Sequence, residues 1–230
     1  MTRPLLLVGA GGFARETAEA VRSARQFVLV GFADDDRALV GTELDGLPVL
    51  GPPEVLLEHD DWMAVLCPGP GAARAALADR LGAQGVTEDR WATVVHAAAV
   101  VPASCAVGRC TVVLAGTVLT TAVRLGRHVA VMAGCVLTHD DVVEDFATLC
   151  ARVALAGRVH VGAGAYLGAG CLVREHLTVG DRAVLGMGAV VLQDVPADEV
   201  WVGVPARRLR GRPARLDEGE RFALETKETR

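Results

Sequence analysis

Residues 95–196 read, divided into steps of six, VHAAAV VPASCA VGRCTV VLAGTV LTTAVR LGRHVA VMAGCV LTHDDV VEDFAT LCARVA LAGRVH VGAGAY LGAGCL VREHLT VGDRAV LGMGAV VLQDVP. These are 17 consecutive hexads without an insertion, and every one begins with Val or Leu. The fifth position usually holds a small or β-branched residue, with Asp141 and Leu177 as exceptions. A period of six fits neither a helix nor the alternation of an ordinary strand. The pattern therefore predicts a repeat architecture.

The repeat predicts a parallel β-helix, a coil with three flat sides in which each hexad forms a short strand and a corner. Three hexads, or about 18 residues, complete one turn, so that neighbouring turns bury a common interior. We expect this domain to occupy residues 95–210. Glycine at the second position, as at Gly108 and Gly126, suits corners that need unusual backbone dihedrals. The period does not determine the handedness of the coil.

The composition excludes several classes of function. Apolar residues make up 51% of the chain but aromatic residues only 4%, which fits an interior of small repeated coils. A net charge of −5 argues against a nucleic-acid partner. Glycines and charges interrupt every apolar run before about 18 residues, which argues against a membrane span. No signal peptide is recognisable, so a cytoplasmic protein is expected.

Residues 1–94 predict a separate domain of the Rossmann-like α/β type. Strands are expected over 5–8, 27–32 and 63–67, and helices over 15–24 and 72–81. The first strand runs into the glycine turn Gly9-Ala10-Gly11-Gly12, and the second ends in Asp34-Asp35-Asp36. Such a turn brings backbone N–H groups to a phosphate, and the acids lie where they can bind ribose or sugar hydroxyls. The domain is too short for two mononucleotide halves, so one nucleotide is favoured over NAD. A purely structural role of the glycines in packing stays open.

His139 is the candidate catalytic residue of the repeat domain. A neutral imidazole can remove a proton from an amine or hydroxyl that attacks a thioester, and an adjacent carboxylate, Asp140 or Asp141, can orient the ring. One coil further on, Gly157 occupies the same third hexad position. Its backbone N–H is predicted to stabilise negative charge on the thioester oxygen.

Two other chemistries were weighed for this domain. His128, His139, His160 and His176 do not converge as a zinc site requires, so no metal is predicted. Cys150 has no obvious base beside it in the sequence, so a covalent intermediate is not favoured. Cys105, Cys135 and Cys171 fall at the small fifth position and are predicted to fill the interior.

The chain resembles the bacterial sugar O- and N-acetyltransferases typified by sialic acid O-acetyltransferases and the acetyltransferases of UDP-4-amino-sugar pathways. The resemblance rests on LLLVGAGGFARETAEAV, GFADDD, LTHDDVVEDFATLCARVALAGRVHVGAGAYLGAG and LGMGAVVLQDVPADEVWVGVPAR, and covers nearly the whole length. It implies a left-handed coil, a homotrimer, and acetyl-CoA as co-substrate in the groove between two coils. It also implies direct transfer to a small-molecule acceptor, with His139 as base, Asp140 as its partner, and the Gly157 amide on the acetyl carbonyl.

The resemblance also supplies the expected binding residues. Those for the coenzyme are Thr148, Gly157, Gly186, Gly203, Pro205 and Arg207. Those for the acceptor are Gly9, Gly11, Gly12, Phe13, Asp34 and Asp35. Relatives often carry GGHxK at the glycine turn, where this chain has Phe13 and Arg15. This difference favours an acceptor other than a UDP-sugar, such as an amino sugar or an amino group on a secondary metabolite. Thr148 stands where many relatives have a second histidine, and Glu144 replaces a usual corner glycine.

Several alternatives remain at the level of sequence. The chain could instead be a scaffold or a sugar-nucleotide-binding protein with a purely structural coil, or an NAD-dependent enzyme. The sequence identifies neither the acceptor nor its acylated atom, and it does not exclude a larger acyl donor. The charged residues 211–230 are expected to form a short exposed helix or a tail without function.

Overall fold

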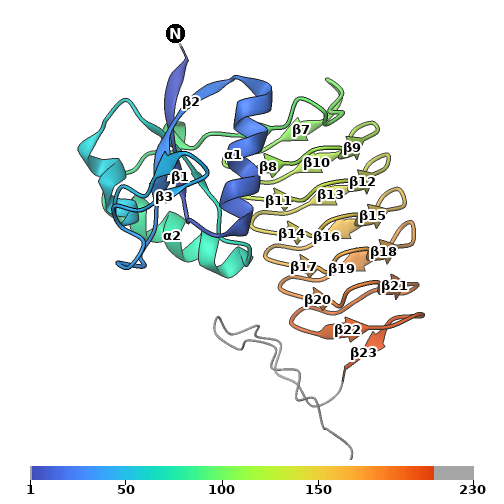
Figure 1. Cartoon of the computed structure of the whole chain (residues 1–230). Helices are drawn as coiled ribbons and strands as arrows, with labels where there is room; N and C mark the ends of the chain where they lie inside the picture. Colours follow the sequence, from blue (N-terminus) through green and yellow to red (C-terminus); the bar gives the residue numbers. More distant parts are fainter. Residues whose placement is uncertain (1, 210–230) are drawn as a thin grey trace, which may run out of the picture.

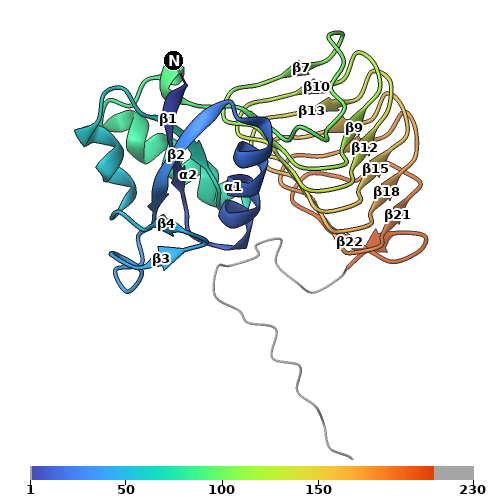
Figure 2. The same cartoon turned by 45° about the horizontal axis from the view of Figure 1, so that its top comes forward.

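The computed structural model describes residues 2–209 of the chain and consists of an α/β domain packed against a left-handed parallel β-helix (Figures 1 and 2). The predicted fold class is confirmed. The prediction for residues 211–230 lies outside the described residues. No helix within residues 2–209 is both long and apolar enough to cross a membrane.

The front domain is built on a three-stranded parallel sheet with strand order β2-β1-β5. Its elements are β1 (Arg3–Val8), α1 (Gly12–Ala24), β2 (Phe27–Ala33), β3 (Glu43–Leu44), β4 (Leu47–Pro48), η1 (Pro53–Glu58), β5 (Met63–Leu66), α2 (Gly71–Ala83) and η2 (Glu88–Arg90). Leu5, Leu6 and Leu7 are fully buried, as the apolar run predicts. The β3–β4 hairpin was not predicted, and α1 begins three residues earlier than expected.

Three parallel sheets form the sides of the β-helix. The sheet that faces the front domain, here the domain-facing sheet, contains β6 (Val94–Val95), β8 (Val112–Val113), β11 (Ala130–Val131), β14 (Thr148–Leu149), β17 (Tyr166–Leu167), β20 (Val184–Leu185), β22 (Val200–Val202) and β23 (Arg207–Arg208). The second, here the apolar sheet, contains β9 (Val118–Leu119), β12 (Val136–Leu137), β15 (Ala154–Leu155), β18 (Leu172–Val173) and β21 (Val190–Val191). The third, here the polar sheet, contains β7 (Ala106–Val107), β10 (Arg124–Leu125), β13 (Val142–Val143), β16 (His160–Val161) and β19 (Thr178–Val179).

The strand register confirms the prediction that three hexads form one turn of the coil. Val136 pairs with Ala154, and Leu137 with Leu155, so each strand meets the strand 18 residues later. The first-position residues point inward: Leu137 and Leu155 are almost fully buried. Cys135 and Cys171 are buried in the same interior, as predicted.

A buried arginine joins the two domains. Arg74 of α2 is almost fully buried, and its guanidinium donates to the carbonyl oxygens of His128 at 2.8 Å, Phe146 at 2.9 Å and Ala147 at 3.0 Å. At the start of α2, a Cβ at Gly71 would lie 2.0 Å from the carbonyl oxygen of Phe146. Only glycine therefore lets α2 approach the β-helix this closely.

Candidate functional site

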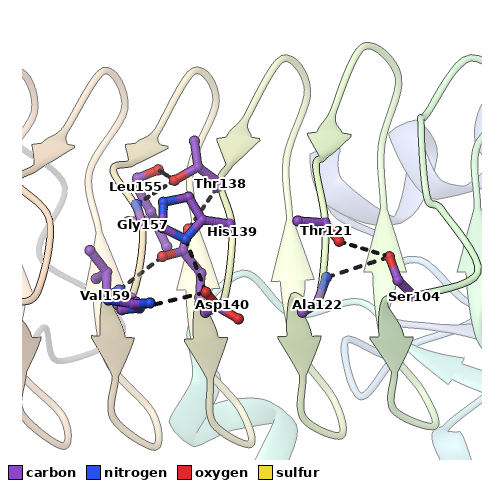
Figure 3. Close-up of polar contacts among 11 residues, drawn as sticks. Ser104, Thr121, Ala122, Thr138, His139, Asp140, Leu155, Gly157 and Val159 are labelled. Atoms are coloured by element: carbon purple, nitrogen blue, oxygen red, sulfur yellow. Dashed lines mark hydrogen bonds and ion pairs between the residues drawn. The ribbon is translucent and has the colours of Figure 1, made fainter.

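His139 lies at the corner between the apolar sheet and the polar sheet, directly after β12. We call this edge the histidine corner; it comprises residues 102–104, 120–122, 138–140, 156–158 and 174–176. The His139 side chain is 56% exposed, and its Nδ1 lies 3.0 Å from Oδ2 of Asp140 (Figure 3). A carboxylate at Nδ1 favours the tautomer with the proton on Nδ1. The Nε2 lone pair is then left to accept a proton.

Of the two neighbouring acids, Asp140 is the partner of the ring and Asp141 has a structural role. The Asp141 side chain is fully buried. Its Oδ2 accepts the N–H of Thr138 at 2.7 Å, and its Oδ1 accepts that of Val159 at 2.9 Å. Burial raises the pKa of Asp141 to about 6, and the backbone hydrogen bonds oppose that shift. Through these two hydrogen bonds, Asp141 attaches the corner that contains His139 to the next coil.

Arg158 adds a cation to the site. Its Nε lies 3.6 Å from Oδ2 of Asp140, the oxygen that also contacts His139. The hydrogen bond from His139 and the charges of His139 and Arg158 lower the pKa of Asp140 below its ordinary value. Asp140 is therefore an anion at neutral pH and can stabilise a protonated imidazole. Arg158 was not predicted as a site residue from the sequence.

Gly157 lies one coil below His139, as predicted, and the ring covers it. Its backbone has a φ of +55°, and a Cβ added there would lie 2.6 Å from Nε2 of His139. Glycine is therefore required for the ring to take this position. The prediction of a bare amide is wrong for this chain, because Gly157 is buried and its N–H donates to the hydroxyl of Thr138.

The predicted coenzyme residues do not all lie together. Thr148 is fully buried between the domains, where its hydroxyl donates to the carbonyl oxygen of Gly69 at 2.9 Å and accepts from Arg74 at 3.0 Å. The front domain therefore covers Thr148, away from the exposed histidine corner. Gly186 and Gly203 lie at the other edge of the apolar sheet, where the N–H of Val190 donates to the carbonyl of Gly203 at 3.0 Å. The exposed Pro205 and Arg207 follow Gly203 in the chain.

The front domain has a cavity of about 320 Å³ at the carboxyl ends of its strands. Its lining includes three of the predicted acceptor residues, Gly9, Asp34 and Asp35. Arg80, which the sequence analysis missed, donates to both carboxylate oxygens of Asp35 at 3.0 and 3.1 Å. The cavity thus has a charged rim beside apolar side chains such as Leu77.

The other three predicted acceptor residues do not line this cavity. Gly11 and Gly12 are exposed at the start of α1. Phe13, predicted to bind the acceptor, is buried in the hydrophobic core of the front domain and does not line the cavity. Asp34 also has a structural role, because its Oδ2 accepts the N–H of Ala10 at 2.7 Å and so holds the glycine turn.

The alternative chemistries find little support in this geometry. Burial raises the pKa of the Cys150 thiol, which is nearly inaccessible and therefore a poor nucleophile. Within residues 2–209, no group of three or more His, Cys, Asp or Glu side chains is arranged to hold a metal ion. His128 is buried between Trp91 and Phe146, at a different corner from His139.

Taken together, the structure is a three-sided β-helix of hexapeptide repeats with an exposed histidine–aspartate pair at one corner. Residues 4–81 match the family model described as the PglD N-terminal domain. The structure is similar to the acetyltransferase domain of PglB from Neisseria gonorrhoeae FA1090, with 27% identity, coverage of 90% of this chain and 100% of that one, and a TM-score of 0.82. That domain has also been solved with acetyl coenzyme A. The chain is therefore similar to sugar acetyltransferases built on hexapeptide repeats.

Two further relatives are informative. PerB from Caulobacter crescentus, solved with CoA and GDP-perosamine, is 28% identical, with coverage of 90% of this chain and 97% of that one and a TM-score of 0.81. Two related structures are variants of this perosamine N-acetyltransferase in which a histidine is replaced by asparagine or alanine. An acyl-carrier-protein–UDP-N-acetylglucosamine O-acyltransferase of Pseudomonas putida F1 is 41% identical over 68 residues. That match covers 30% of this chain and 26% of the relative, so the curated relatives are matched over about a quarter of their length.

Proposed function

We propose that this protein transfers an acetyl group from acetyl-CoA to an amine or hydroxyl of a sugar, and that the sugar is nucleotide-linked. The observation that carries the proposal is the His139–Asp140 pair stacked on Gly157. With Nδ1 held by Asp140, Nε2 of His139 accepts the proton of the attacking group, and Asp140 stabilises the imidazolium. The relatives solved with acetyl coenzyme A, CoA and GDP-perosamine support the donor and the class of acceptor.

The acceptor is proposed to occupy the cavity of the front domain. Apolar side chains such as Leu77, beside the charged rim of Asp35 and Arg80, suit a base or sugar with polar edges. Since Phe13 belongs to the core, the glycine turn offers no polar side chain at that position. This supports an acceptor different from a UDP-sugar, and GDP-linked amino sugars are the first class to test.

A homotrimer is proposed because one side of the β-helix has an exposed apolar surface. The outward residues of the apolar sheet are Val100, Val118, Val136, Ala154, Leu172 and Val190. Val100 is 51% exposed, Val136 38% and Leu172 47%. The polar sheet instead presents Arg124 and His160 in the same row. A continuous apolar surface of this kind favours contact with another subunit.

In the proposed trimer, residues that are far apart in one chain come together in one site. When three prisms pack their apolar sheets around a three-fold axis, the histidine corner of one copy meets the opposite edge of the next copy's apolar sheet. That edge carries four of the predicted coenzyme residues, Gly186, Gly203, Pro205 and Arg207. The front domain of that next copy packs on the adjacent, domain-facing sheet. The acceptor cavity of one subunit therefore serves His139 of its neighbour in this arrangement.

The proposal is tested by measuring thiol release from acetyl-CoA with a panel of GDP-, UDP- and dTDP-linked amino sugars and free amino sugars. His139→Ala is expected to lower turnover by about 10²- to 10⁴-fold, the usual contribution of a general base. His160→Ala is the matched control, because His160 is also exposed and also paired with an acid, Glu144, but lies on the polar sheet. Full activity of His139→Ala refutes the base. Binding of acetyl-CoA without thiol release for any acceptor favours a binding protein.

A further inference from the structure

The hydroxyl of Thr138 lies at the centre of the contacts beneath the catalytic pair. Thr138 directly precedes His139 and is half-buried at the histidine corner. Its Oγ1 donates to the carbonyl oxygen of Leu155 at 3.0 Å and accepts the N–H of Gly157 (Figure 3). The hydroxyl oxygen therefore occupies the position at which a thioester oxygen would have to accept from the Gly157 amide.

The proton of this hydroxyl is free to change its partner. The carbonyl of Leu155 also accepts the backbone N–H of Thr138 at 3.3 Å, so it keeps a donor when the hydroxyl turns away. The Thr138 N–H is held in place by Asp141 at 2.7 Å. The bond that Oγ1 accepts from Gly157 polarises the hydroxyl and makes its proton a better donor.

We propose that the Thr138 hydroxyl is a catalytic residue that donates a hydrogen bond to the thioester oxygen as negative charge develops there. This inference rests on the proposed function. The acceptor nitrogen or oxygen attacks the carbonyl carbon, its proton goes to Nε2 of His139, and the C=O electron pair moves to the oxygen that Thr138 stabilises. When the carbonyl re-forms, the C–S bond breaks and the sulfur takes the proton from the imidazolium. The products are the acetylated acceptor and CoA thiol.

The competing assignment, direct donation by the Gly157 amide, predicts the opposite effect of removing the hydroxyl. If the amide is the donor, Thr138 blocks it, and a variant without the hydroxyl is as fast as the wild type or faster. If the hydroxyl is the donor, the same variant loses the stabilisation of the oxyanion. Removal of one oxyanion donor typically lowers kcat by about 10²- to 10³-fold.

The experiment compares Thr138→Val, Thr138→Ala and Thr138→Ser with the wild type in the thiol-release assay. We expect Val and Ala to lower kcat by about 10²-fold while leaving the dissociation constant of acetyl-CoA nearly unchanged, and Ser to restore most of the activity. Thr120→Val, at the same hexad position one coil earlier, is the control and should keep wild-type kcat. Circular dichroism and thermal unfolding select the variants that are folded, and either Val or Ala alone is sufficient for the comparison with Ser.

Unchanged or increased kcat in Thr138→Val or Thr138→Ala overturns the inference and assigns the oxyanion to the Gly157 amide. Loss of activity in a folded Thr138→Ser equal to that in Thr138→Ala also overturns it, because serine retains the donor. Absence of thiol release from the wild type with every acceptor refutes the proposed function itself. The two failures are therefore distinct.

Discussion

Replacing Gly157 with alanine tests whether the proposed site depends on the stacking of His139 on that residue. The new Cβ would lie 2.6 Å from Nε2 and 2.9 Å from Cε1 of His139, whereas ordinary contacts begin at 3.4 Å. The ring must therefore move by roughly 1 Å, and a displacement of about this size lowers turnover by about 10²-fold. The φ of +55° at position 157 adds a cost of about 1 kcal/mol in stability for any residue with a Cβ.

The control for this variant is Gly164→Ala. Gly164 has a similar φ of +66°, and its added Cβ meets only the Cγ of Arg182, at an ordinary 3.5 Å. It lies at the corner between the polar and domain-facing sheets, away from the proposed site. Both variants should lose about 1 kcal/mol of stability in urea titrations, but only Gly157→Ala should lose activity in the thiol-release assay. Wild-type kcat in a folded Gly157→Ala refutes the argument that this glycine makes room for the imidazole.

Three further predictions concern assembly and stability. Val136→Asp, on the apolar sheet, should convert trimers to monomers in sedimentation velocity, whereas Val142→Asp, in the same coil on the polar sheet, should not; a monomeric wild type contradicts the trimer. Arg74→Met removes the guanidinium hydrogen bonds to five carbonyl oxygens, so it should lower the free energy of unfolding by about 3 kcal/mol in urea, and an unchanged midpoint contradicts the role of Arg74. Burial lowers the pKa of His128 from 6.5 to about 4 in the folded chain, so its contribution to stability is complete above pH 6.5 and is lost as the pH falls toward 4. The stability advantage of the wild type over His128→Asn should therefore shrink by up to about 3 kcal/mol across that range; a constant difference contradicts it.

The hexad period was sufficient to predict the β-helix and the relation between His139 and Gly157. A coil with a fixed number of residues per turn stacks positions 18 apart, so their adjacency follows from counting alone. The same count could not show that the Gly157 amide has a partner. That contact depends on the rotamer of the Thr138 side chain, which the period does not determine.

Contacts between the domains explain the burial of Thr148, and the start of α1 explains that of Phe13. Thr148 is buried because α2 and the turn before it pack on the coil, through contacts between residues more than 70 positions apart in the sequence. Phe13 entered the core because α1 begins at Gly12, not at Arg15, which turns the side chain toward the sheet. The local periodicity of the sequence predicts neither the packing of α2 on the β-helix nor the exact first residue of α1.

Asp141 is the one charged residue at the fifth hexad position, and it stabilises the backbone of the proposed site. Asp141 breaks the rule that the fifth position is small or β-branched, and a buried carboxylate is costly unless it is hydrogen-bonded. Its two oxygens accept the N–H groups of Thr138, which directly precedes His139, and of Val159, which lies two residues after Gly157. The two hydrogen bonds compensate the cost of burying Asp141. They lie at the corner where the coil must hold His139, Thr138 and Gly157 in fixed positions. A residue that violates a local pattern and still has every oxygen bonded indicates a requirement of the site, not of the fold.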